Sequence, residues 1–68
     1  MKKKTRILLM DGDMPDKSLD LDDFLPNIQE GQIMRVFDKK TKIIDISHTI
    51  FERDNVMQVV QVVAIDHE

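Results

Sequence analysis

The sequence predicts a small α+β fold that is mainly β: one small antiparallel sheet of about four strands, with one short helix or acidic loop. Three observations support this class. The chain has 68 residues, which suits a single small domain, 1–68. Its apolar residues occur in short runs rich in Val and Ile, which favour strands. Turn-forming residues separate these runs, and the longest polar stretch is acidic and contains both prolines.

The first predicted strand covers residues 5–10, TRILLM, and ends at a turn formed by Asp11, Gly12 and Asp13. Residues 1–6, which overlap the start of this strand, carry four basic side chains and no acid. Charged ends of a chain are commonly disordered, so we expect residues 1–4 to form a frayed basic terminus.

An acidic segment follows, because residues 7–30 carry seven acids against the single base Lys17. Ser18 is suited to cap a short helix that Pro26 would end. Leu19 and Leu21 also alternate as they would in a strand. We therefore expect a short helix or an irregular acidic loop near residues 18–30.

The next segment predicts a β-hairpin. Residues 32–38 alternate in the manner of a strand, residues 38–41 (DKKT) supply turn formers, and residues 42–47 resume a β-branched run. The spacing indicates a loop somewhat longer than two residues. After it, residues 47–55 (SHTIFERDN) suggest a polar break.

The last apolar run, residues 56–65, is consistent with either a helix or a strand. Valines at helical spacing permit an amphipathic helix, but the run is the most β-branched in the chain, which favours a strand. A strand here is apolar on both faces. One face carries Val56, Val60, Val62 and Ala64, and the other carries Met57, Val59, Val63 and Ile65.

A strand that is apolar on both faces needs cover on both sides, which a chain of this size hardly provides. The sequence has no cysteine and only two histidines, so disulfides and thiolate metal sites are excluded as additional supports. We therefore expect a homodimer in which Val56, Val60 and Val62 contribute to self-association.

Asp11 and Asp13 raise the hypothesis of a divalent-metal site. A strand followed by acids resembles the first strand of response-regulator receiver domains, and the two acids resemble the D-x-D motif of haloacid-dehalogenase-type phosphatases. Those folds need a doubly wound sheet of roughly 100 or more residues. A calcium loop fails on spacing, because Pro15 and Asp16 occupy its fifth and sixth positions. We therefore expect a turn, with no metal and no cofactor.

Few residues suggest catalysis. Ser47 and His48 are adjacent, but neighbours on a strand point to opposite faces. With only Gly12 and Gly31 there is no glycine-rich phosphate loop. We therefore expect a protein that is not an enzyme.

The function we expect is that of a small non-catalytic interaction or regulatory module that binds another protein. The acidic segment offers the partner-binding candidates Asp16, Asp20, Asp22, Asp23 and Phe24. One alternative is a nucleic-acid-binding β domain, through Arg35, Lys40 and Lys42, although the net charge of -3 opposes it. A second alternative is a divalent-metal-binding acidic loop at Asp11 and Asp13. We expect a cytoplasmic protein without a membrane segment, of a kind that suits an accessory protein of a phage or mobile element.

Overall fold

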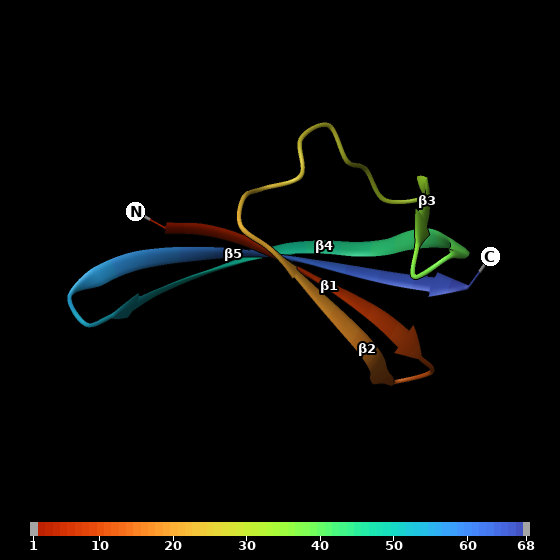
Figure 1. Cartoon of the computed structure of the whole chain (residues 1–68), viewed down its shortest axis with the longest axis horizontal. Helices are drawn as coiled ribbons and strands as arrows, with labels where there is room; N and C mark the ends of the chain where they lie inside the picture. The colour runs from red at the N-terminus through yellow and green to blue at the C-terminus, as the bar shows by residue number, and fades with distance from the viewer. Residues whose placement is uncertain (1, 68) are drawn as a thin grey trace.

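The computed structural model describes residues 2–67, which contain five strands and no helix. The strands form one mixed sheet, curled into a half-barrel, in the order β2-β1-β5-β4-β3 (Figure 1). The prediction of a mainly β chain is confirmed. The α+β class, the helix that was one of the two alternatives for the acidic segment, and the purely antiparallel four-stranded sheet are wrong. The strands are β1 (Lys2–Asp11), β2 (Met14–Leu21), β3 (Ile33–Val36), β4 (Lys39–Arg53) and β5 (Val56–His67).

The two central strands, β1 and β5, run parallel to each other. Their register runs from Lys2 opposite Gln58 to Leu9 opposite Ile65, and the other three strand pairs are antiparallel. Residues 2–4, which we expected in a frayed terminus, lie in β1 and pair with β5. Met1 lies outside the described residues. Because this parallel pairing joins residues near the two ends of the chain, no local sequence pattern predicts it.

Two-residue turns connect three of the strand pairs. Gly12 has a φ of 65° between β1 and β2, where the positive angle suits glycine. The predicted hairpin at 32–47 is confirmed as β3 and β4, but its turn is Phe37-Asp38, with φ of 56° and 58°, and not the longer DKKT loop. Both angles are positive, as in a type I′ turn, which matches the twist of paired strands.

β4 and β5 form a long hairpin that extends from one end of the sheet (Figure 1). Its turn is Asp54-Asn55, with φ of 53° and 64°, because Asp and Asn tolerate this left-handed conformation. The polar break predicted at 47–55 is therefore wrong, since residues 47–53 continue β4. The strand predicted at 56–65 is confirmed as β5.

Part of the acidic segment forms β2 instead of a helix. Leu19 and Leu21 lie opposite Ile7 and Thr5 of β1, and the polar side chains between them face the other way. A β-bulge at Asp16 interrupts this pairing, because Leu9 faces Lys17 and Met10 faces Pro15. Residues 22–32 are irregular, as the alternative prediction of an acidic loop required.

One face of the sheet, here called the core face, holds the hydrophobic core, and the opposite face is called the outer face. Side chains alternate between the two faces, and the alternation predicted for 56–65 is confirmed, because Val59, Val63 and Ile65 are buried. Leu25 and Ile28 of the loop 22–32 pack over the core face. The core consists of Ile7, Leu9, Val36, Ile43, Val63 and Ile65.

A buried amide fixes this loop. Gln61, 5% exposed, accepts a hydrogen bond from the Leu25 N–H at 2.9 Å and donates one to the Leu25 carbonyl at 3.4 Å. The buried Thr5 hydroxyl lies 2.8 Å from the Asp23 carbonyl and 2.9 Å from Gln61 Oε1, and its one proton serves one acceptor at a time. The loop therefore closes the core in place of a helix.

Candidate functional site

The residues predicted to bind a partner lie on different parts of the molecule. Asp16 is the bulge residue of β2, while Asp22 and Asp23 begin the exposed loop. Phe24 packs toward the core face, where its ring lies 5.5 Å from that of His48, edge to face. Nothing in this arrangement gathers the predicted set into one continuous surface.

Asp20 is already engaged within the chain. Its carboxylate lies 3.0 Å from Lys4 Nζ and accepts hydrogen bonds from Arg6 Nε at 3.0 Å and Arg6 Nη2 at 3.3 Å. The hydrogen bonds from Arg6 and then Lys4 hold the pKa of Asp20 down at about 2. The hydrogen bond with Asp20 also raises the pKa of Arg6. Asp20 therefore offers less charge to a basic partner than the sequence suggests.

Asp11 and Asp13 flank Gly12 in the exposed turn between β1 and β2, as the turn prediction stated. Among residues 2–67, no group of three or more His, Asp or Glu side chains is arranged to hold a metal ion. The same residues include no helix long and apolar enough to cross a membrane.

The predicted nucleic-acid residues share one face. Arg35 lies directly opposite Lys40 in the β3–β4 register, and Lys42 lies two residues along β4 on the same side. All three are exposed on the outer face. The register of β3 with β4 brings them together, since the sequence pattern had assigned Lys40 to a turn and not to a strand.

A second basic region on the outer face was missed. A hollow of about 370 Å³ has Phe51 and two valines of β5 beside three cations from two strands. Phe51 and Arg53 were not predicted as site residues because they fall in the segment interpreted as a polar break. The lining consists of Lys4, Arg6, Thr49, Phe51, Arg53, Gln58, Val60 and Val62.

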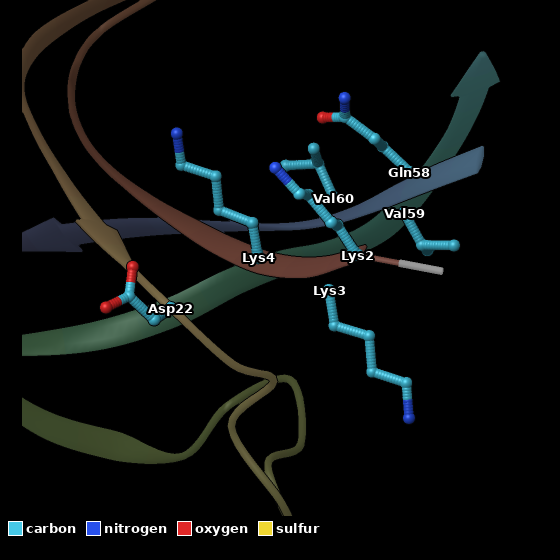
Figure 2. Close-up of a pocket in the computed structure, with 7 residues that line it drawn as sticks. All are labelled: Lys2, Lys3, Lys4, Asp22, Gln58, Val59 and Val60. Carbon is cyan, nitrogen blue, oxygen red and sulfur yellow. The ribbon is translucent and has the colours of Figure 1, made fainter. Parts of the chain in front are cut away.

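Another hollow, of about 490 Å³, lies where β1 begins (Figure 2). Lys2, Lys4 and Val60 extend to one side of the sheet, and Lys3 extends to the other. Lys3 Nζ lies 5.6 Å from the centre of the Phe24 ring. Because its lining is divided between two faces, this hollow does not converge on one ligand.

The residues predicted for self-association lie on β5. Val56, Val60 and Val62 share the outer face, opposite Arg53, Thr49 and Ser47 of β4. Val60 and Val62 are half-buried, and β5 is paired on both sides over Gln58–Ile65. They can therefore meet another chain only through the face of the sheet, and not by strand pairing.

Besides the terminal strands β2 and β3, part of β4 also has an open edge, because β3 covers only its first residues. β3 pairs only with residues 39–42, and Gly31 and Gln32 add backbone hydrogen bonds to Ile43. Beyond the bulge at Ile44, residues 45–53 have β5 on one side and no strand on the other within the described chain. Unpaired N–H and C=O groups along such an edge are a template for another strand.

The edge of β2 and the uncovered part of the β4 edge differ in how they are protected. β2 carries Pro15, the bulge at Asp16 and charged side chains at Lys17 and Asp20, which are the usual means of blocking an edge. The β4 edge has no proline, and its exposed apolar side chains include Ile50, 65% exposed, and Phe51, 38% exposed. We therefore take residues 45–53 as the candidate functional site.

No protein-family model, curated protein or solved structure matches this chain.

Proposed function

We propose that this protein is a small non-catalytic interaction module that binds another protein chain as an added β-strand along the free edge of β4. The observation that supports it is the unpaired stretch 45–53, whereas the β2 edge on the opposite side of the sheet is blocked. In this mode of recognition, main-chain hydrogen bonds supply affinity and the alternating side chains supply specificity.

The side chains along the edge suit this role. Ile46 and Ile50 lie on the core face, and Phe51 lies on the outer face beside Arg53. Except for half-buried Ile46, every side chain from Asp45 to Arg53 is exposed. An incoming strand would cover apolar groups on both faces without displacing any part of the core.

The test compares two matched substitutions of exposed apolar residues. Ile50→Lys alters the β4 edge. Met14→Lys alters the first residue of β2, away from that edge, where Met14 is 70% exposed. Both variants should fold with stabilities within about 0.5 kcal/mol of the wild type. In native mass spectrometry of the tagged protein, Ile50→Lys should lose the bound chain and Met14→Lys should retain it. A complex equally retained by both variants would contradict the proposal.

A second candidate function is supported by the outer-face hollow, which Phe51 lines together with Arg6 and Arg53. An aromatic ring on a sheet, flanked by cations, is an arrangement that binds single-stranded nucleic acids. The neutralising contact of Asp20 with Arg6 weakens it. Fluorescence anisotropy with a mixed-sequence oligonucleotide at low salt should then show binding that Phe51→Ala reduces. An unchanged anisotropy would exclude this function.

A further inference from the structure

The backbone of β4 presents its free hydrogen-bonding groups at alternate residues. Arg53 and Val56 flank a two-residue turn, so they form a hydrogen-bonded pair, and Arg53 directs its N–H and C=O toward β5. Thr49 has the same parity as Arg53 and also faces β5. The residues that alternate with this set direct their backbone N–H and C=O groups to the free edge. They are Ile46, His48, Ile50 and Glu52.

We propose that the strand added at this edge is β4 of a second copy of the chain, antiparallel to the first, with Thr49 on the two-fold axis. This inference rests on the proposed function, because it uses the same edge. Residues that face each other must lie on the same face of the joint sheet. A centre at residue 49 meets this condition and gives every residue of 45–53 a partner.

Charge complementarity selects the same register. With Thr49 opposite Thr49 of the second copy, Asp45 lies opposite Arg53 of the second copy, and the symmetry repeats this pair at the other end. Opposite charges directly across an antiparallel pair are stabilising. A centre at His48 would instead place Arg53 opposite Ile43, whose backbone already bonds to Gly31 and Gln32. A centre at Ile50 would leave Asp45 beyond the paired segment.

The register also brings apolar side chains together. On the core face, Ile50 lies opposite His48 of the second copy and diagonal to its Ile46 and Ile50. In the single chain Ile50 is 65% exposed, and these neighbours would cover it. The backbone contributes about eight hydrogen bonds, two from each of four pairs of edge-facing residues. An edge used for pairing needs no blocking residues, and residues 45–53 contain neither proline nor lysine.

The absence of cysteine makes the register directly measurable. Thr49 lies opposite Thr49 of the second copy in a non-hydrogen-bonded pair. The Cα atoms of such a pair lie about 4.5 Å apart, within the range of a disulfide. Under mild oxidation, Thr49→Cys should form a covalent dimer of twice the 8.0 kDa chain mass. Ser47→Cys, equally exposed on the same face, is the matched control. Its two thiols would lie about 13 Å apart along the strands and should remain reduced.

A second variant tests the edge without a thiol. His48→Pro removes an N–H that faces the free edge and leaves the β4–β5 ladder intact, so it should yield a folded monomer at concentrations where the wild type is a dimer. A monomeric wild type, or a dimer that persists in His48→Pro without Thr49→Cys cross-linking, would overturn the second-copy inference. If the wild type is monomeric but binds a different protein that Ile50→Lys releases, only this inference fails and the proposed function stands.

Discussion

Replacing Gln61 by leucine should release the loop 22–32 from the core face. The Gln61 amide is buried and holds both the N–H and the carbonyl of Leu25, at 2.9 Å and 3.4 Å. Leucine has a similar volume, so the change removes these hydrogen bonds without opening a large cavity. Leu25, which packs against the core, then loses the backbone contacts that position it.

The magnitude follows from the groups left without partners. A buried polar group that loses its partner costs about 1 to 3 kcal/mol. Leu25 is only half-buried, so water can reach its backbone in part, and the Thr5 hydroxyl keeps the Asp23 carbonyl. We therefore expect the free energy of unfolding to fall by about 2 to 4 kcal/mol. For a domain of this size, that lowers the melting temperature by about 10 to 30 °C.

The assay is urea and thermal denaturation followed by circular dichroism, at one fixed protein concentration because self-association would add to stability. Gln58→Leu is the matched control, since Gln58 lies on the outer face of the same strand and its side chain makes no hydrogen bond within the described residues. It should change stability by less than about 0.5 kcal/mol. A loss equally small for Gln61→Leu would refute the role given to this amide.

Three further predictions concern the core, a turn and an ion pair. Leu9→Ala, at a fully buried side chain, should cost about 2 to 5 kcal/mol in urea denaturation, and a cost below about 1 kcal/mol would contradict its place in the core. Asp38→Gly should raise stability by about 0.5 to 1 kcal/mol, because glycine relieves the positive φ, and a lower melting temperature would contradict this. The ion pairs of Asp20 with Arg6 and Lys4 stabilise the fold above the ordinary carboxyl pKa of 3.8, and this stabilisation is lost as the pH falls through about 2. The stability difference between wild type and Asp20→Asn should therefore shrink from pH 6 to pH 2, and a constant difference would be inconsistent with the pairing.

Local patterns predicted the elements whose partners are close in sequence. The hairpin of β3 and β4 follows from alternation on both sides of turn formers. The β-branched run at 56–65 forms a strand, with its two faces as predicted, because side-chain alternation depends on the backbone alone.

Two other features of the sheet were not predicted in this way. β2 is acidic and contains Pro15, and it becomes a strand because Leu19 and Leu21 pair with β1 while Asp20 meets Arg6. The parallel pairing of β1 with β5 joins the two ends of the chain, and such contacts leave no periodic signal.

The candidate site was likewise predicted only in part from the sequence. Arg35, Lys40 and Lys42 were named from the sequence, but only the register of β3 with β4 places them on one face. The free edge of β4 depends on strand order, which the sequence pattern does not contain. A signal was nevertheless present, because Ile50 and Phe51 interrupt the polar segment 47–55 with apolar residues next to a type I′ turn.

Amide hydrogen exchange of β4, measured by NMR over a range of protein concentrations, tests the pairing of this edge most directly. The N–H groups of Thr49 and Phe51 face β5 and should be protected at every concentration. Those of His48 and Ile50 face the free edge and should exchange rapidly when dilute and slowly when concentrated. Rapid exchange of His48 and Ile50 at all concentrations, without any bound partner, would contradict pairing of this edge with a second copy.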